Sequence, residues 1–302
     1  MVKAVGYIDG EIDVLENIKV PVLDRGFLYG DSIYEVFRTY EGIPFMYDEH
    51  YERLLNSASL IGMTVTHTAA QIRDAVMATL AKSDVNAGED IYVRYQITRG
   101  SGPIDLNPDL SEGNRLIIIV KGVPKWNQSY YTNGVRLAVP VLRRNSVTSL
   151  DPNIKGGNYL NNILALAQAR ESGADDCVML DANRKVTECS NSNVWFVIGD
   201  QIVTPLRGNL IGLTRKTLVN LLEADGVDVL EREIDCEELK NATECFVTSA
   251  TREVMPVISL ALEDRTQVDF APGGGPETRR AMELYQQMLV NFKRDNAALA
   301  LF

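Results

Sequence analysis

Strand-like and helix-like apolar patterns follow one another irregularly along this chain, and that irregularity constrains the fold most. Apolar residues alternate with period two at 91–98 and 135–141, which is typical of strands. They recur every three to four residues at 48–61 and 157–170, which is typical of helices. Because the two patterns do not alternate regularly, the sequence predicts an α+β fold rather than a doubly wound parallel sheet.

Shorter patterns predict further elements. A hairpin is expected in 4–20, turning at Asp9-Gly10, and the apolar run at 116–123 predicts a strand buried on both faces. The remaining expectations are strands at 193–198, 201–204 and 245–248, helices beginning near Thr214 and spanning 277–292, and a loop at 271–276.

A chain of 302 residues is long enough for two moderate domains. Residues 121–133 contain Pro, Asn, Gln and aromatic residues without a clean period, so they are the candidate connection. We therefore expect a smaller N-terminal α+β domain over 1–122, a connection over 123–133 and a larger C-terminal domain over 134–302.

Composition excludes some classes of partner. Thirty basic against 41 acidic residues give a net charge of −11, which argues against nucleic-acid or anionic-membrane surfaces. The four cysteines form no CxxC and lie far from both histidines, so we expect no metal site and reduced thiols. With no signal-peptide core and no apolar run of membrane-spanning length, a cytoplasmic protein is expected.

Two residues have the chemistry of a carbonyl-cofactor site. Lys155 stands between a non-helical stretch and a helical one, before two glycines that allow close approach. A lysine amine loses its proton readily on burial and then attacks carbonyls. Glu188 lies among small polar residues just before a strand, where a buried carboxylate needs a cation or a protonated ring nitrogen. Either residue alone also fits an ordinary exposed side chain.

Three segments could bind an anion. Residues 208–216 form a turn before a helix, 246–257 form a strand ending in small hydroxyl residues, and Arg53 lies between apolar helix positions. A helix cap by Thr214, a polar loop and a solvent-reaching arginine are the alternatives. A lysine, a carboxylate, two phosphate cradles and an arginine are together what pyridoxal phosphate requires.

The chain also resembles a known family, the fold-type IV pyridoxal-phosphate enzymes. These include branched-chain, D-amino-acid and (R)-amine aminotransferases and aminodeoxychorismate lyases. Six motifs occur in the family's order: LDRGFLYGDSIYEVFRTYEG (23–42), HYERL (50–54), KGGNYL (155–160), VTECSNSNVW (186–195), LIGLTR (210–215) and VTSATREVMPV (247–257). The resemblance implies a two-domain fold-type IV enzyme whose C-terminal domain binds the cofactor.

The resemblance also implies roles for individual residues. Lys155 is implied as the Schiff-base lysine and proton shuttle, and Glu188 as the partner of the pyridine nitrogen. Ala250 stands where relatives often have threonine, which removes a hydroxyl contact but keeps the backbone N–H. The other implied cofactor-binding residues are Leu210 on the ring, Tyr159 near the ring hydroxyl, Asn193 in support, and Arg53, Leu213, Thr214, Ser249 and Ala250 at the phosphate.

Substrate signals are mixed. Tyr92-Val93-Arg94 resembles the Tyr-x-Arg of branched-chain aminotransferases, and Ile104 and Leu106 replace the Arg-x-His of D-amino-acid enzymes. Tyr34-Glu35-Val36 instead resembles the D-type pattern. Alternation puts Tyr92, Arg94 and Gln96 on one strand face, so we expect Arg94 to bind a carboxylate, with Tyr34 and Arg38 as the other candidates.

The sequence thus predicts a transaminase that moves an amino group from an amino acid, branched-chain type favoured, or an amine to a 2-oxo acid such as 2-oxoglutarate or pyruvate. A D-amino-acid or (R)-amine aminotransferase, a lyase of the same family and a non-catalytic small-molecule binder are the alternatives. The resemblance also implies a homodimer.

Overall fold

The computed structural model of this protein describes residues 2–86 and 88–302, which form two compact units. Unit 1 consists of Met1–Pro124, Ile154–Asn158 and Asn291–Phe302, and unit 2 of Lys125–Asn153 and Tyr159–Val290. The sequence predicts that the chain passes from one domain to the other once, at 123–133. In the structure two later segments, Ile154–Asn158 and Asn291–Phe302, are also part of unit 1. The short segment Ile154–Asn158 contains Lys155, so this lysine belongs to unit 1.

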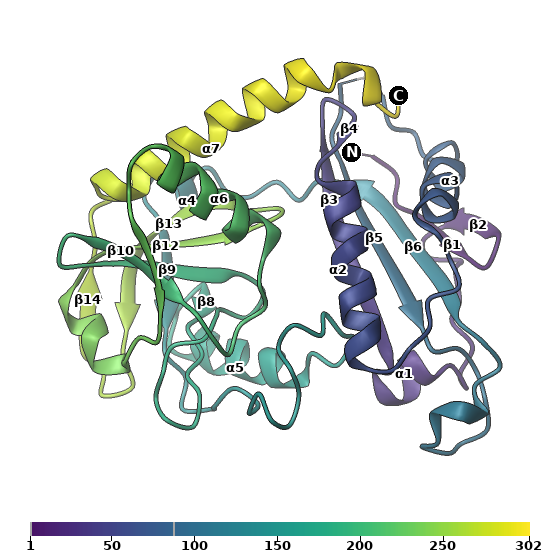
Figure 1. Cartoon of the computed structure of the whole chain (residues 1–302), viewed down its shortest axis with the longest axis horizontal. Coiled ribbons are helices and arrows are strands. Elements are labelled where there is room, and N and C mark those ends of the chain that lie inside the picture. Colours follow the sequence, from purple (N-terminus) through teal and green to yellow (C-terminus); the bar gives the residue numbers. More distant parts are fainter. Residues whose placement is uncertain (1, 87) are drawn as a thin grey trace. The chain divides into compact units, whose positions relative to one another are not determined.

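Unit 1 is built on a six-stranded sheet in the order β2-β1-β6-β5-β3-β4 (Figure 1). All of its pairs are antiparallel, and β1 and β2 form the hairpin expected at Asp9-Gly10. Helices α2 and α3 pack against the sheet, with α2 on β3 and α3 on β6 and β1. The elements of unit 1 are β1 (Val5–Ile8), β2 (Glu11–Val14), α1 (Arg25–Tyr29), β3 (Ser32–Tyr40), β4 (Ile43–Pro44), α2 (Tyr47–Leu60), α3 (Ala69–Leu80), β5 (Ile91–Thr98), a 3₁₀ turn (Pro108–Leu110) and β6 (Arg115–Gly122).

The central strands of this sheet have one apolar face and one mixed face. In β5, Ile91, Val93 and Tyr95 are buried while the residues between them are half-buried, so the alternation expected for this strand is confirmed. The expectation that 116–123 is buried on both faces is wrong. In β6 buried residues alternate with half-buried ones, because antiparallel strands of this kind bury one face against helices.

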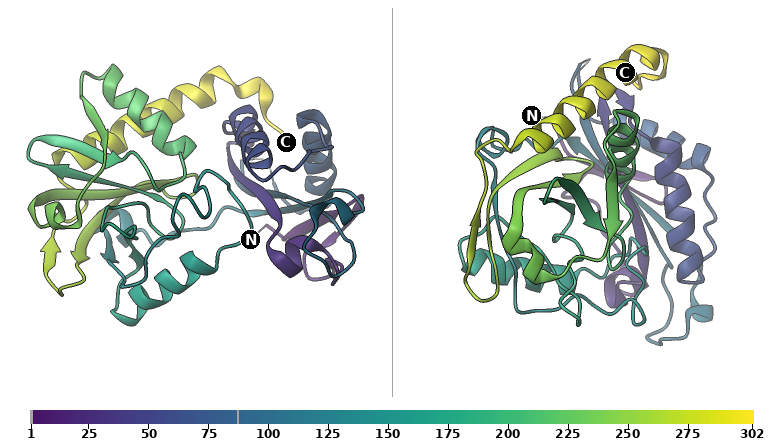
Figure 2. Two further views of the ribbon diagram at one scale, coloured as in Figure 1. Left: turned by 60° about the horizontal axis from the view of Figure 1, so that its bottom comes forward. Right: turned by 60° about the vertical axis from the view of Figure 1, so that its left-hand side comes forward.

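Unit 2 is built on an eight-stranded sheet in the order β11-β10-β9-β12-β13-β7-β8, with β14 paired to β13. Figure 2 shows its strands curving around a common core, which the buried side chains of β7, β9, β12 and β13 fill. Helix α6 packs on β12 and β11, and α5 on β8. The elements are α4 (Ser129–Thr132), β7 (Val135–Ala138), α5 (Leu160–Glu171), β8 (Asp176–Cys177), β9 (Asn193–Ile198), β10 (Gln201–Pro205), α6 (Leu213–Ala224), β11 (Val229–Arg232), a 3₁₀ turn (Cys236–Asn241), β12 (Ala242–Ser249), β13 (Glu253–Ala261) and β14 (Gln267–Asp269).

Helix α7 (Pro276–Asp295) follows the expected loop at 271–276, and a 3₁₀ turn (Ala297–Leu299) ends the chain. Two boundaries differ from expectation. The strand begun at Val135 ends at Ala138, since Pro140 cannot continue a ladder of hydrogen bonds. The helix expected from residue 157 begins only at Leu160, because Gly156 and Gly157 are paired with β3 instead. In the described part of the chain, no helix is both long and apolar enough to cross a membrane.

Candidate active site

Lys155 is held in unit 1 by contacts on both sides of its backbone. Its amide donates to Ser57 Oγ on α2 at 3.1 Å, and its carbonyl accepts from the Tyr34 amide on β3 at 2.9 Å. Ser57 Oγ in turn donates to the Arg53 carbonyl at 3.1 Å. Lys155 itself lies in a loop, but its backbone is hydrogen-bonded to β3 and α2, which position it as a reacting group requires.

The Tyr34 side chain contacts two cationic groups. Lys155 Nζ donates to Tyr34 Oη at 3.4 Å and lies 4.6 Å from the ring centroid. The Arg94 guanidinium carbon lies 3.6 Å from the same centroid, which is a stacked cation–π contact. Because Tyr34 is only 6% exposed, these contacts are well shielded from water. The same ring thus contacts both an arginine and the lysine amine.

Arg53 is bound to a carboxylate of the protein itself. Its Nε and Nη2 donate to the two oxygens of Glu35 at 2.7 and 2.8 Å, a bidentate pair. His50 Nδ1 lies 2.7 Å from Glu35 Oε2. The anion that an arginine needs between apolar helix positions is therefore Glu35, which fixes the plane of the guanidinium.

Glu35, His50 and Arg53 form a hydrogen-bonded triad. Burial and the ion pair between Arg53 and Glu35 set the protonation of its carboxylate and its imidazole. Burial alone raises the pKa of Glu35, but the charge of Arg53 and the hydrogen bonds from Arg53 and His50 outweigh it and hold that pKa well below its usual range. Burial lowers the pKa of His50, and the bond to Glu35 offsets only part of that. At neutral pH His50 is therefore uncharged, with Nδ1–H donating to an ionised Glu35.

The triad predicts how stability depends on pH. The folded pKa of His50 lies below its unfolded value of about 6.5, so the unfolded chain binds more protons and the free energy of unfolding falls as pH drops through about 6.5. The depressed pKa of Glu35 adds stability above its unfolded value of about 4.3, and this is lost as pH falls further. Urea unfolding at pH 5, 6, 7 and 8 measures this trend.

Two variants isolate the contributions. His50→Asn is expected to flatten the stability change between pH 5 and 7, and His67→Asn, which changes the other histidine of the chain, serves as the control. Glu35→Gln is expected to cost about 3–5 kcal/mol at neutral pH, because it removes the carboxylate charge from a bidentate ion pair with Arg53. A His50→Asn variant with the wild-type pH profile would contradict the assignment.

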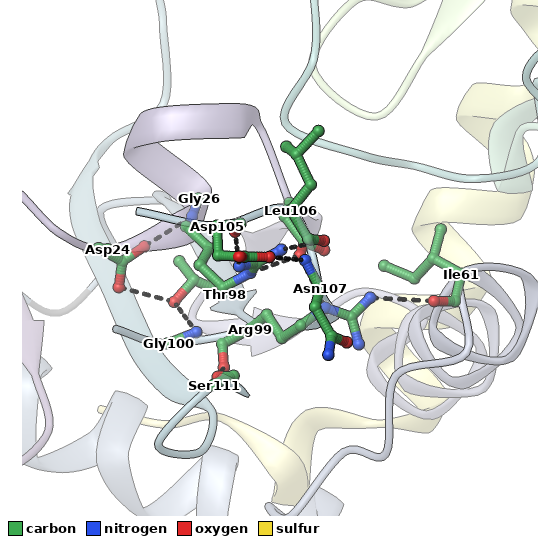
Figure 3. Close-up of polar contacts among 12 residues, drawn as sticks. Asp24, Gly26, Ile61, Thr98, Arg99, Gly100, Asp105, Leu106, Asn107 and Ser111 are labelled. Atoms are coloured by element: carbon green, nitrogen blue, oxygen red, sulfur yellow. Dashed lines mark hydrogen bonds and ion pairs between the residues drawn. The ribbon is translucent and has the colours of Figure 1, made fainter. Parts of the chain in front are cut away.

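The loop after β5 is anchored in unit 1 by arginines (Figure 3). Arg25 donates to the carbonyls of Asp105 and Leu106 at 2.6 and 3.0 Å. Arg99 donates to Asp31 at 2.7 Å and to the Ile61 carbonyl at 3.0 Å. These contacts fix the backbone of a segment that has little apolar burial of its own.

Two apolar side chains of that loop are exposed. Ile104 is 78% exposed and Leu106 is 76% exposed, so the loop presents two apolar side chains rather than a cation. An exposed apolar pair on an ordered loop fits a surface for another molecule better than a stabilising role.

Glu188 is the centre of a polar network in unit 2. One of its oxygens accepts from Arg144 Nη2 at 2.6 Å, and the other accepts from the Leu210 amide at 3.1 Å. Arg144 also donates to Asn162 Oδ1 at 2.8 Å, and Asn193 Nδ2 donates to the Leu210 carbonyl at 2.8 Å. The carboxylate is 7% exposed, so it is a buried anion whose direction is fixed from two sides.

The start of α6 lacks a side-chain cap. Gly212 occupies the cap position, so the expected alternative of a cap by Thr214 is wrong; Thr214 is the second residue of the helix. A Cβ at Gly212 would lie 2.1 Å from Asn193 Oδ1, which explains the glycine. The amides of Leu213 and Thr214 at this helix start have no cap oxygen from Gly212, and such amides suit an anion.

The turn after β12 is held by a second buried ion pair. Ser249 Oγ accepts from the Arg252 amide at 3.2 Å, and Ala250 follows in the same turn. Arg252 Nη1 donates to Asp176 at 2.7 Å and to Ser192 Oγ at 3.1 Å. This arginine therefore ties the Ser249–Ala250 turn to the loop that follows Glu188.

The structure divides the residues expected from sequence between its two units. Arg38 pairs with Asp90 at 3.4 Å and stacks on Tyr40, and Tyr92 faces it across the β3–β5 pair. Tyr159 immediately precedes α5. Unit 1 contains Tyr34, Arg38, Arg53, Tyr92, Arg94 and Lys155; unit 2 contains Tyr159, Glu188, Asn193, Leu210, Leu213, Thr214, Ser249 and Ala250.

Sequence reasoning missed several neighbours of these residues. Glu35 at an inward position of a strand, with His50 and Arg53 three apart on a helix, was a detectable sign of a buried ion pair. Arg144 gave no such sign, because its partner Glu188 lies 44 residues away.

The four cysteines are free and buried, and burial raises the pKa of each thiol. Among residues 2–86 and 88–302 there is no group of three or more His, Cys, Asp or Glu side chains that could hold a metal ion.

Comparisons with known proteins identify the family. Residues 32–260 match the family model described as amino-transferase class IV. The chain is 32% identical over 281 residues to D-alanine aminotransferase of Listeria monocytogenes, covering 91% of this chain and 92% of that one.

Two solved structures are also similar. A branched-chain aminotransferase of Thermoproteus uzoniensis with norvaline is 29% identical, covers 99% of both chains and gives a TM-score of 0.84. A branched-chain amino acid aminotransferase of T.th. with pyridoxamine 5'-phosphate is 25% identical, covers 94% of this chain and 93% of that one, and gives a TM-score of 0.82. This chain belongs to the class IV aminotransferases, the fold-type IV transaminases that use pyridoxal phosphate.

Proposed function

We propose that this aminotransferase moves an amino group from a branched-chain amino acid to a 2-oxo acid such as 2-oxoglutarate or pyruvate. The observation that carries the acid specificity is the Arg94 guanidinium stacked on Tyr34, the same ring that meets Lys155 Nζ. A planar guanidinium recognises a carboxylate, and an amine beside it can act on the neighbouring carbon.

The residues present fit pyridoxal phosphate. A buried carboxylate that already accepts from Arg144 and Leu210 stays ionised and can hold the proton of a ring nitrogen. An uncapped helix start at Gly212 and a serine turn at Ser249 suit a phosphate dianion. We propose that Arg53, Tyr159, Glu188, Asn193, Leu210, Leu213, Thr214, Ser249 and Ala250 hold the cofactor, that Lys155 carries it, and that Tyr34, Arg38, Tyr92 and Arg94 line the substrate site.

The ion pair with Glu35 limits what Arg53 can contribute to phosphate binding. Two of its nitrogens donate to Glu35, so the pair as a whole carries no net charge. Any phosphate contact by Arg53 would therefore be a hydrogen bond from an oriented guanidinium, and the helix start would supply the larger share of the binding.

When bound, pyridoxal phosphate supplies a conjugated ring that takes up the electron pair released at the carbon bearing the amino group. Lys155 Nζ would take the proton from that carbon and return it to the neighbouring position as a general base and acid. Tyr34 Oη, which accepts from Nζ at 3.4 Å, would keep the amine in reach between these two steps. Arg94 would bind the substrate carboxylate and orient the bond that loses the proton.

A D-amino-acid or (R)-amine donor is the second candidate. The likeness to D-alanine aminotransferase favours it, as does the Tyr34-Glu35-Val36 pattern. Ile104 and Leu106 favour the branched-chain donor, since they stand in place of the Arg-x-His pair of D-amino-acid enzymes and neither can pair with a carboxylate there.

A half-reaction panel tests the donor. The cofactor-loaded protein is mixed with L-leucine, L-valine, D-alanine and (R)-1-phenylethylamine, and the loss of the cofactor's visible absorbance is followed. The largest rate constant is expected with L-leucine or L-valine. A larger one with D-alanine or the amine would replace the proposed donor with the second candidate.

Assembly and location are part of the same proposal. We propose a homodimer, supported by the apolar side chains that the anchored loop exposes at Ile104 and Leu106. Sedimentation equilibrium measures the mass, and a monomer with full activity would refute the homodimer.

We also propose a cytoplasmic location, which the four free cysteines support. The sequence division into 1–122 and 134–302 remains a proposal that limited proteolysis can test.

A further inference from the structure

Gln96 on β5 connects the proposed carboxylate-binding arginine to the backbone of the lysine segment. Its Oε1 accepts from Arg94 Nη2 at 2.9 Å, and its Nε2 donates to Ser32 Oγ at 2.9 Å. Arg94 has only donors, so the amide oxygen has to face it and the amide nitrogen has to face Ser32. The orientation of Gln96 is therefore determined by both neighbours.

The second glycine of the KGG motif closes this network. The Gly157 amide donates to the Ser32 carbonyl at 2.9 Å, and a Cβ at Gly157 would lie 2.3 Å from Ser32 Oγ and 3.6 Å from Gln96 Nε2. Any side chain at this position would push Ser32 away from Gln96. The close approach of Ser32 thus explains why a glycine stands at position 157, two residues after Lys155.

We propose that Gln96 is a positioning residue that determines specificity by fixing Arg94 on the Tyr34 ring. An arginine side chain loses considerable rotamer entropy when it binds a ligand. With Nη2 held by Gln96 and the plane stacked on Tyr34, Arg94 has lost that freedom before substrate arrives. Arg94 is then presented to a carboxylate in one orientation, on the ring that Lys155 also contacts.

The geometry selects a substrate class. The amine of Lys155 and the guanidinium carbon of Arg94 lie 4.6 and 3.6 Å from the centroid of the same Tyr34 ring, so an acid bound by Arg94 would lie beside the residue that the amine contacts. Glu35 neutralises Arg53, whereas Arg94 is held by a neutral amide and keeps its full charge. Oxo acids with a free carboxylate for Arg94, such as the diacid 2-oxoglutarate, are therefore the ligands that Gln96 would favour. This inference rests on the proposed function.

The test compares Gln96→Leu, Arg94→Ala and the double variant with the wild-type holoenzyme. In the half-reaction of the aminated enzyme, Gln96→Leu is expected to raise the apparent KM for 2-oxoglutarate roughly tenfold, the scale of one charge-assisted hydrogen bond, and to change the maximal rate less than about twofold. In the Arg94→Ala background it is expected to add nothing, because Gln96 acts through Arg94. Gln267→Leu, which removes an exposed glutamine that bonds to Asp269, is the matched control.

Calorimetric binding of glutarate gives a readout that does not need turnover. Gln96→Leu is expected to weaken glutarate roughly tenfold as well. An unchanged glutarate affinity, a loss confined to the maximal rate, or a further loss in the Arg94→Ala background would overturn the role of Gln96. If the wild-type protein binds glutarate but transaminates no donor in the panel, the proposed function fails instead.

Discussion

Replacing Lys155 with alanine is expected to remove covalent attachment of pyridoxal phosphate and to lower the half-reaction rate by at least about 10²–10⁴, the usual contribution of a general base. Borohydride reduction of the wild-type protein should fix the pyridoxyl group as a stable amine on one peptide, the one that contains Lys155. The reason is local, because the backbone amide of Lys155 is bound to Ser57 of α2 and its side-chain amine donates to Tyr34 of β3 at 3.4 Å.

The control is a lysine with an ordinary environment. Lys185 pairs with Asp235 at 2.8 Å near the surface, so Lys185→Ala should keep both the labelled peptide and the rate. Label on a peptide other than that of Lys155, or a Lys155→Ala variant with wild-type rate, would refute the assignment of the catalytic lysine.

The elements that sequence predicted best are those whose apolar period is uninterrupted. The alternation at 91–98 predicted β5 to the residue, and the spacing at 48–61 predicted α2 to within a residue at each end. The sequence did not predict the strand β3, because Glu35 stands at an inward position and interrupts the apolar alternation. Its partners Arg53 and His50 come from another element, and only the folded chain brings them together.

The candidate site divides in a similar way. Motifs identified Lys155 and Glu188, because each has a distinctive local sequence. Their supports are long-range: Gln96 and Ser32 are 64 residues apart, and Arg144 and Asn162 come from a loop and a helix. A single sequence contains no signal for such pairs, since each partner alone is an ordinary polar residue.

The KGG motif at 155–157 was predicted correctly in one respect and wrongly in another. Sequence reasoning interpreted its two glycines as room for another molecule, and extended a helix through them. In the structure Gly156 and Gly157 pair with β3, so the helix begins later and the close approach of Gly157 is to Ser32 of the chain itself. A glycine predicts close approach but not the identity of the neighbour.

Glu188→Gln is expected to bind pyridoxal phosphate but to lose on the order of 10²–10³ in the half-reaction rate, the scale of one preorganised charged contact. A neutral amide cannot keep a proton on the ring nitrogen, and without that proton the ring withdraws electrons poorly. Stopped-flow absorbance with the donor that the panel identifies measures the rate, and equilibrium dialysis measures cofactor binding.

A variant of Arg144 distinguishes this electronic role of Glu188 from a loss of stability. Glu188→Gln leaves Arg144 without its 2.6 Å partner, so part of any defect would come from a buried unpaired cation, which typically costs about 3–5 kcal/mol of stability. In Glu188→Gln with Arg144→Met both charges are gone, so the stability should recover toward wild type while the rate stays low. Recovery of the rate together with the stability would mean that Glu188 only supports the fold. A low rate in a stable double variant would assign the carboxylate to the ring nitrogen.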